Sequence, residues 1–391
     1  MCDGKLAIPK LGRAWQIMET SYETNRVIGM RVLWVFEALS PQMLGLAAEV
    51  DRQPDIDLRI MTRSALPAEL AHLSAPSVAC RNKVDFRARW QIRAHLKQNH
   101  YDVAHAYTSR NMANLAGACW GWRDAPLLIG YRGTIDRIKR LDPANLLTFL
   151  NSRFARIHCV CHATQAALAS SGIPADKLVT VWEGCDPSLL HVRSREVLGE
   201  FGIPPEAFVV GTIANARTVK GIDLLLRSAL ELAHVPDIYW LIVGAVVDPL
   251  VTRLASDQRL EGRVKLVGSQ PSGGGFAGLM DIYVAPSRKE GLSMGIMEAM
   301  SQGVCPIVSD VGGNPELIRH QVDGLVVPTE SPLAISQAIG ELRRDPSKRA
   351  QYAASSQRRA AEVFSIEAWG NRLCNAYRQL ANGSCQLVRA A

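Results

Sequence analysis

Glu290 and Glu298, separated by seven residues, are the side chains whose types and spacing most clearly suggest chemistry. Even along a continuous helix, the rise per residue would place them roughly 12 Å apart, which is too far for two carboxylates to share one proton. That separation suits the two ends of one elongated ligand. Because carboxylates accept hydrogen bonds from hydroxyl groups, we expect each glutamate to hold a hydroxyl-bearing end of such a ligand.

The stretch between the two glutamates offers groups that would bind an anion. Gly291 and Gly295 allow the backbone to approach a ligand closely. A helix predicted from residue 296 presents unpaired N–H groups and the positive end of its dipole at its start, which suits a phosphate. Sugar hydroxyls at one glutamate, ribose hydroxyls at the other and a diphosphate between them describe a nucleotide sugar.

The elements around this stretch form one repeating unit of a parallel sheet. The apolar run 282–285 predicts a buried strand that ends at Pro286. Good helix formers follow at 296–301, and Gly303 closes that helix as a C-terminal glycine. The apolar run 305–308 predicts the next strand. Ligands of such sheets bind beyond the carboxyl ends of the strands, where both glutamates would lie.

Several short motifs occur in order through this block. They are Pro286-Ser287, Glu290-Gly291, Glu298-Ala299-Met300, Gly303, Pro306, Gly312-Gly313 and Pro315-Glu316. Together they resemble the E-x7-E signature region of retaining glycosyltransferases of family GT4. The resemblance implies an α/β fold of the GT-B type, in which two Rossmann-like domains with doubly wound parallel sheets face each other across a cleft.

The same resemblance assigns roles to residues of the block. Glu290 would bind hydroxyls of the donor sugar and orient its anomeric carbon, and Glu298 would hold the ribose. The backbone amides that face the donor would come from Gly291, Leu292, Ser293 and Met294.

A second segment resembles another signature of this family. A predicted strand at 208–213 precedes Arg217 and Lys220, and Gly221 then opens a helix. In the family such cations hold the donor diphosphate, and two fixed cations would neutralise its charge as it departs. Asn215 is the alternative match to the family's arginine position.

The segment 273–278 matches the pattern G-x-G-x-x-G of dinucleotide-binding proteins. The next predicted strand begins only a few residues later, so no Rossmann helix fits after it. We therefore expect a loop without a role in cofactor binding.

The first half of the chain departs from the family pattern at two places. The family's glycine-rich loop after the first strand would fall at 37–45, where only Gly45 is present. Arg132 stands where many members have a histidine that contacts the sugar or the acceptor. An arginine there would bind an anionic acceptor group or pair structurally with Asp136. His105, on the preceding strand, is a second acceptor-side candidate, although a packed core histidine is the more ordinary interpretation.

The alternation of strands and helices predicts two domains. We expect a disordered leader at 1–29, an acceptor-side domain at 30–190 and a nucleotide-sugar-binding domain at 205–364. The last helix, 365–391, should pack back onto the first domain, and 187–207 should form the linker.

The chain carries a formal net charge of +7, and residues 1–200 hold 25 Lys and Arg against 19 Asp and Glu. Much of this surplus lies at 81–97, where Phe86 and Trp90 are interleaved with basic residues. Such a cluster suits peripheral contact with an anionic membrane surface, and a solvated helix face explains it equally well. No pattern typical of nucleic-acid-binding domains accompanies it.

The nine cysteines include no C-x-x-C pair. Cys159, Cys161 and His162 lack the second ligand pair of a structural zinc site, so we expect buried thiols and no metal. With no signal peptide and no apolar run of ~18 residues, the cytoplasm is the expected compartment, with a peripheral position at the inner face of the membrane as a further expectation.

We therefore expect a retaining glycosyltransferase that needs no metal or other cofactor. It would move a sugar from a nucleotide-diphosphate sugar to a hydroxyl of a glycan or lipid-linked acceptor, in the synthesis of lipopolysaccharide, capsule or exopolysaccharide. Two alternatives stay open, a nucleotide-sugar epimerase of the same fold and a non-catalytic nucleotide-sugar-binding subunit.

Overall fold

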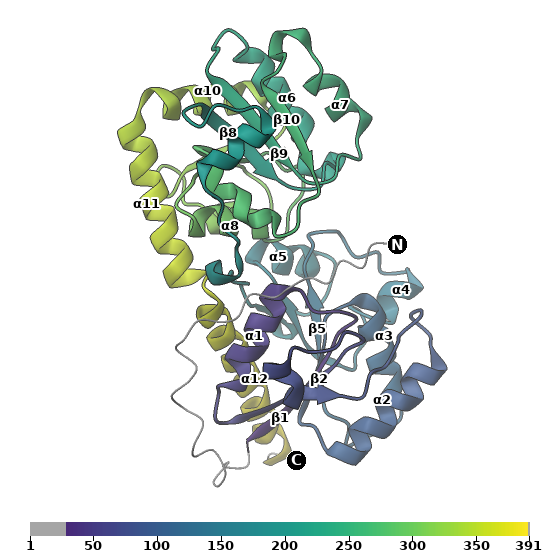
Figure 1. Cartoon of the computed structure of the whole chain (residues 1–391). Helices are drawn as coiled ribbons and strands as arrows, with labels where there is room; N and C mark the ends of the chain where they lie inside the picture. Colours follow the sequence, from purple (N-terminus) through teal and green to yellow (C-terminus); the bar gives the residue numbers. More distant parts are fainter. Residues whose placement is uncertain (1–28, 390–391) are drawn as a thin grey trace, which may run out of the picture.

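The computed structural model describes residues 29–389, with side chains through residue 382, so the expected leader lies almost wholly outside it. Two α/β domains, each built on one fully parallel sheet, lie one above the other (Figure 1). The strand orders are β3-β2-β1-β4-β5-β6-β7 and β10-β9-β8-β11-β12-β13. In both, the order reverses beside the first strand of the domain, as in doubly wound folds, which confirms the predicted fold class.

The elements of the first domain alternate along the chain. Its strands are β1 (Met30–Val35), β2 (Ile56–Met61), β3 (Ser74–Ala75), β4 (Val103–Ala106), β5 (Leu127–Arg132), β6 (Phe154–Cys159) and β7 (Leu178–Thr180). Its helices are α1 (Pro41–Asp51), α2 (Phe86–Asn99), α3 (Ser109–Ala118), α4 (Pro143–Leu146) and α5 (His162–Ser170).

The second domain repeats the pattern. Its strands are β8 (Phe208–Ile213), β9 (Ile238–Val243), β10 (Val264–Gly268), β11 (Ile282–Ala285), β12 (Cys305–Ser309) and β13 (Leu325–Val327). Its helices are α6 (Ile222–Glu231), α7 (Pro249–Ala255), α8 (Met294–Ser301), α9 (Asn314–Leu317), α10 (Pro332–Arg344) and α11 (Pro346–Val363). Every residue of β11 and β12 is buried, because helices cover both faces of the sheet, and this explains their continuous apolar sequences.

The last helix, α12 (Ile366–Arg389), lies against α1 of the first domain rather than against the second (Figure 1). Its Trp369 and Tyr377 are buried in the first domain's core. The Tyr377 hydroxyl accepts a hydrogen bond from the Trp34 indole at 2.8 Å. The chain thus crosses between the domains twice, and the two crossings touch where Cys185 N donates to Phe364 O at 2.8 Å.

The carboxyl ends of the two sheets face each other. Gly133, which follows β5, meets Gly291 in the loop after β11 so closely that a Cβ on Gly291 would collide with the Gly133 carbonyl. Lys289 of the same loop forms an ion pair with Asp136 of the first domain. The loop that carries Glu290 therefore lies at the boundary between the domains.

Candidate active site

The centre of the candidate site is an ion pair between two loops of the second domain. Lys220 Nζ lies 2.6 Å from Glu290 Oε2, and both side chains are largely buried, with 22% and 12% of their surface exposed. The Ser287 hydroxyl donates to the same carboxylate oxygen at 3.2 Å. Lys220 follows β8 and Glu290 follows β11, two adjacent strands, so the sheet itself brings the two predicted catalytic residues together.

Glycines let these loops approach. Gly221 has φ +65°, and a Cβ there would collide with the Pro286 carbonyl. Gly312, in the loop after β12, has φ +54°, and a Cβ there would collide with the Glu290 carbonyl. L side chains rarely adopt such backbone angles, so these two positions need glycine for conformation as well as space.

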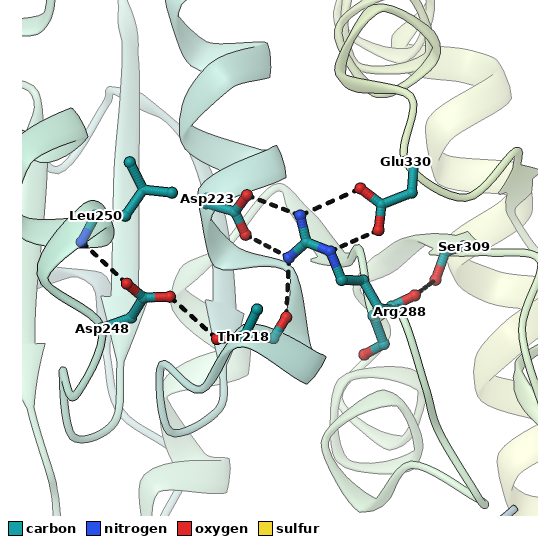
Figure 2. Close-up of polar contacts among 8 residues, drawn as sticks. Thr218, Asp223, Asp248, Leu250, Arg288, Ser309 and Glu330 are labelled. Atoms are coloured by element: carbon teal, nitrogen blue, oxygen red, sulfur yellow. Dashed lines mark hydrogen bonds and ion pairs between the residues drawn. The ribbon is translucent and has the colours of Figure 1, made fainter.

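Arg288 ties the same loops together through a second set of contacts (Figure 2). Its guanidinium makes two hydrogen bonds with the buried Asp223 carboxylate, at 2.6 and 2.8 Å, and also contacts Glu330. It donates in addition to the Thr218 carbonyl at 2.9 Å. These charged partners raise the pKa of Arg288, whose hydrogen bonds hold the pKa of Asp223 below its usual value despite burial. Arg288 thereby fixes the loop of Lys220 against the loop of Glu290.

Helix α8 begins at Met294, four residues after Glu290 and two residues earlier than predicted. Gly291, Leu292 and Ser293 are buried, and Met294 is half-buried as the first residue of the helix. In the described structure the N–H groups of 291–294 donate to no acceptor. They lie at the positive end of the helix dipole, as an anion-binding turn requires.

Glu298 lies half-buried in the second turn of α8. Burial raises the pKa of its carboxyl group to about 7. Its neighbour is Gly274, where a Cβ would stand only 2.6 Å from the Glu298 carboxyl carbon. The segment 273–278, which we predicted as a loop without a role, is part of a 3-10 helix (Gly273–Leu279) whose glycine makes room for this carboxylate. Gly274 matters because it lies next to Glu298 in the fold, and no local sequence pattern indicates this contact.

The other two donor-side candidates lie in the loop after β8. Arg217 is exposed, and its side chain makes no hydrogen bond or ion pair within the described residues. Asn215 is exposed as well, and its side-chain oxygen accepts from Ala245 N at 3.0 Å, which joins the loops after β8 and β9. Of the two, Arg217 is the side chain available for a ligand.

The acceptor-side candidates occupy structural positions. Arg132 donates to the backbone carbonyls of Thr134 and Asp136, at 2.9 and 2.7 Å, and its guanidinium lies over the Phe149 ring. It therefore organises the loop after β5, and its partner is the Asp136 backbone rather than the carboxylate. His105 is buried in the first domain with its Nδ1 2.8 Å from the Tyr377 hydroxyl. Both side chains therefore make their hydrogen bonds to groups that stabilise the first domain.

Among the described residues, no three His, Cys, Asp or Glu side chains converge as metal ligands would. Cys159 and Cys161 are buried, the first at the end of β6 and the second as the N-cap of α5.

Comparison with known protein families matches both halves of the chain. Residues 48–189 match the model described as Glycosyltransferase Family 4, and residues 194–359 match the model described as Glycosyl transferases group 1. The chain belongs to the GT4-type glycosyltransferases of GT-B fold. The Lys220–Glu290 pair, the start of α8 and Glu298 all fall within the group 1 match.

Individual relatives of this GT4-type chain are distant. It is 28% identical over 55% of its length to D-inositol 3-phosphate glycosyltransferase 1 of Catenulispora acidiphila. It is 26% identical over 51% of its length to the lipopolysaccharide core biosynthesis mannosyltransferase LpcC of Rhizobium leguminosarum bv. viciae. The chain spans only 55% and 59% of these relatives' own lengths.

Among solved structures, Alr3699/HepE of Anabaena in complex with UDP superimposes with a TM-score of 0.73 at 20% identity. That match covers 90% of this chain and 100% of the other, so the two share a fold over both domains. The same Anabaena protein has also been solved with UDP-glucose.

Proposed function

We propose that this protein transfers a sugar from a nucleotide-diphosphate sugar to a hydroxyl of a glycan or lipid-linked acceptor, with retention of configuration at the anomeric carbon. The observation that carries the proposal is the buried Lys220–Glu290 pair at the start of α8, with Glu298 one helical turn beyond. The complexes of the Anabaena structure with UDP and UDP-glucose support a nucleotide sugar as the ligand of this site.

Each residue has a distinct task in this scheme. The diphosphate would lie against the free N–H groups of 291–294, where Lys220 and the unpartnered Arg217 stabilise the charge that develops on the leaving group. Glu290 would accept hydrogen bonds from hydroxyls of the donor sugar, and Glu298 from the ribose. Because Lys220 already holds Glu290 in place, the donor would meet a preorganised pair rather than two mobile side chains.

Two finer features belong to the proposal. The first is retention by front-face attack, in which the leaving phosphate takes the proton of the acceptor hydroxyl as the new glycosidic bond forms. The second is independence of metal, since the two cations and the helix terminus would supply the positive charge. Support for both comes from the match to the GT4 family.

We propose a role in bacterial surface polysaccharide synthesis, most directly of lipopolysaccharide. The support is the likeness to LpcC, whose name states a role in the lipopolysaccharide core.

The exposed face of α2 supports contact with an anionic membrane. Phe86 and Trp90 are 76% and 71% exposed and lie one turn apart, among the basic residues of 81–97. Trp120 is 76% exposed beside them, and its carbonyl accepts from Arg93 at 2.9 Å. Exposed aromatic rings flanked by cations are typical of surfaces that insert at the lipid headgroups. No helix of the described chain is long and apolar enough to cross a bilayer.

A thermal-shift screen against UDP-, GDP- and ADP-sugars tests the donor proposal. One nucleotide should stabilise the wild type, by ~2.7 kcal/mol at a hundred times its Kd. Glu298→Ala and Lys220→Ala should lose that shift. Lys177→Ala is the matched control, because Lys177 is a half-buried lysine of the first domain whose amine donates to the Ser152 carbonyl rather than to a donor-side residue.

Turnover separates the proposal from its alternatives. Incubation with the donor that binds, with and without a lipopolysaccharide acceptor, should give a glycosylated product whose anomeric configuration, read by NMR coupling constants, matches that of the donor. Conversion of the donor without an acceptor would indicate an epimerase instead. Binding without turnover for every acceptor would indicate a non-catalytic subunit.

A further inference from the structure

One glutamate and two arginines meet on the first domain, outside the donor-side residues. Glu37 follows β1, Arg63 follows β2, and Arg110 lies in the first turn of α3. The Nη1 atoms of Arg110 and Arg63 lie 3.2 and 3.9 Å from the same oxygen, Glu37 Oε1. The three side chains are 45%, 59% and 35% exposed in the order Arg110, Arg63, Glu37. With two guanidinium groups against one carboxylate, the cluster keeps a net positive charge.

The position of this cluster relates it to the candidate active site. Glu37 lies at the carboxyl end of β1, and the sheet order places only β4 between β1 and β5. Gly133, at the carboxyl end of β5, touches Gly291 beside Glu290. Two strand spacings separate these points, so the cluster stands roughly 10 Å from that contact along the same edge of the sheet. This distance is on the scale of one or two sugar units.

The backbone beneath the cluster is fixed, whereas the charged groups reach solvent. Arg63 N donates to the Glu37 carbonyl at 3.3 Å, and the Asn111 side chain donates to the Val35 carbonyl at 3.1 Å, which anchors α3 to the end of β1. The ten-residue helix α3 also directs its N-terminus here, and its dipole adds to the positive potential. The site thus combines preorganised positions with side chains that a ligand can reach.

We propose that Arg63 and Arg110 bind an anionic group of the acceptor, a phosphate or a carboxylate, which takes the place of Glu37 between the two guanidinium groups. Guanidinium groups bind both anions through paired hydrogen bonds. Glu37 can swing into solvent at little cost, because an exposed ion pair contributes little stability. That the bound anion belongs to the acceptor rests on the proposed function, whereas the existence of the anion site does not.

This assignment differs from the expectation drawn from the sequence. There, Arg132 was the candidate for an anionic acceptor group, but its guanidinium is bound to the carbonyls of its own loop. The segment after the first strand lacks the family's glycine-rich loop, and Glu37 begins it. At this place the chain has a charged cluster instead.

The test is a titration of the full chain with inorganic phosphate at constant ionic strength, in which the thermal shift reports binding. The nucleoside diphosphate of the donor identified by the thermal-shift screen is present at saturation, so that the donor site is filled. Arg63→Gln and Arg110→Gln should each weaken phosphate binding about tenfold, the loss expected for one charge-assisted hydrogen bond. Glu37→Gln should strengthen it, because the competing carboxylate is gone. Arg123→Gln, an exposed arginine of the same domain, should leave it unchanged.

A parallel titration with acetate distinguishes carboxylate from phosphate as the preferred anion. Equal phosphate affinity in the wild type, Arg63→Gln and Arg110→Gln would overturn the proposal, as would weaker binding in Glu37→Gln. The Glu37 variant changes affinity in the opposite direction, so general damage to the fold cannot imitate the expected pattern. If no nucleotide sugar of the screen stabilises the wild type, the proposed function fails, and the comparison of Arg63→Gln with Arg123→Gln still decides the anion site.

Discussion

At the scale of single residues, the carboxyl group of Glu298 has an unusually high pKa. Its pKa of about 7 lies above the ordinary 4.5, so the folded protein keeps a proton that the unfolded chain releases as pH rises. The contribution of Glu298 to stability is therefore fully favourable below pH 4.5, falls between about 4.5 and 7, and stays constant above. Glu298→Gln should remove this loss, so that the variant gains about 2 kcal/mol on the wild type between pH 5 and pH 8.

Urea unfolding at the two pH values measures this gain. Glu362→Gln, an exposed glutamate of α11, is the control and should give the same difference as the wild type. Parallel pH profiles for the wild type and Glu298→Gln would contradict the assigned burial. A carboxyl group that is partly protonated near neutral pH can both donate to and accept from ribose hydroxyls, which links this pKa to the proposed role.

Lys220 is the second residue whose change we expect to be decisive. Lys220→Met would leave the Glu290 carboxylate, only 12% exposed, without its cation, and would remove charge from the leaving-group site. Turnover should fall by about 10²-fold or more. Steady-state kinetics with the donor identified by thermal shift measure this, with Lys177→Met as the control. A loss confined to KM would show that Lys220 only binds the donor and does not stabilise its departure.

At the scale of elements, the site depends on Arg288 holding two loops together. Arg288→Gln would leave the Asp223 carboxylate, whose side chain is 6% exposed, unpaired, and should destabilise the fold by about 3 kcal/mol. Adding Asp223→Asn should restore much of that stability, because the buried charge is gone, but not turnover, because the Lys220 loop is still untethered. Chemical denaturation and turnover of the two single variants and the double variant separate the effect on stability from the effect on turnover. Recovery of both together would mean that Arg288 acts only on stability.

The 3-10 helix that carries Gly274 offers a milder probe. Gly274→Ala would place a methyl group against the Glu298 carboxyl group and should weaken nucleotide binding about tenfold with little change in stability. Gly199→Ala is the matched control, because a Cβ there meets no atom within 4 Å. Titration of both variants with the donor nucleotide gives the comparison, and equal affinities would show that the contact is adaptable.

These elements also show which features the sequence can predict. Apolar runs at 282–285 and 305–308, good helix formers at 296–301 and Gly303 were enough for the strand–loop–helix–strand unit, because local periodicity and helix-ending residues specify it. The separate roles of Lys220 and Glu290, 70 residues apart, came from family resemblance, and their ion pair is visible only in the structure. The roles of Arg288 and Gly274 depend on contacts between distant segments, which no local pattern contains.

At the scale of the whole molecule, Glu316 connects the domains. It belongs to α9 of the second domain, yet its carboxylate accepts hydrogen bonds from the backbone N–H groups of His162 and Ala163, both at 2.9 Å, and from the Trp182 indole at 2.7 Å. The first two lie at the start of α5, so the carboxylate also meets the positive end of a helix dipole in the first domain. Together with the Lys289–Asp136 ion pair, this contact holds the two domains together beside the loop of Glu290.

Glu316→Ala should therefore shift the protein toward a more open arrangement, because three donors of the first domain lose the acceptor that the second domain supplies. We expect a larger radius of gyration by small-angle X-ray scattering and a higher KM for the donor, while kcat changes less. Lys289→Gln should produce a smaller shift of the same sign, since its ion pair with Asp136 is exposed and contributes little. Scattering profiles of Glu316→Ala identical to wild type would mean that packing at Gly133 and Gly291 alone holds the domains together. A donor that restores the compact profile of the variant would show that the ligand and Glu316 stabilise the same closed state.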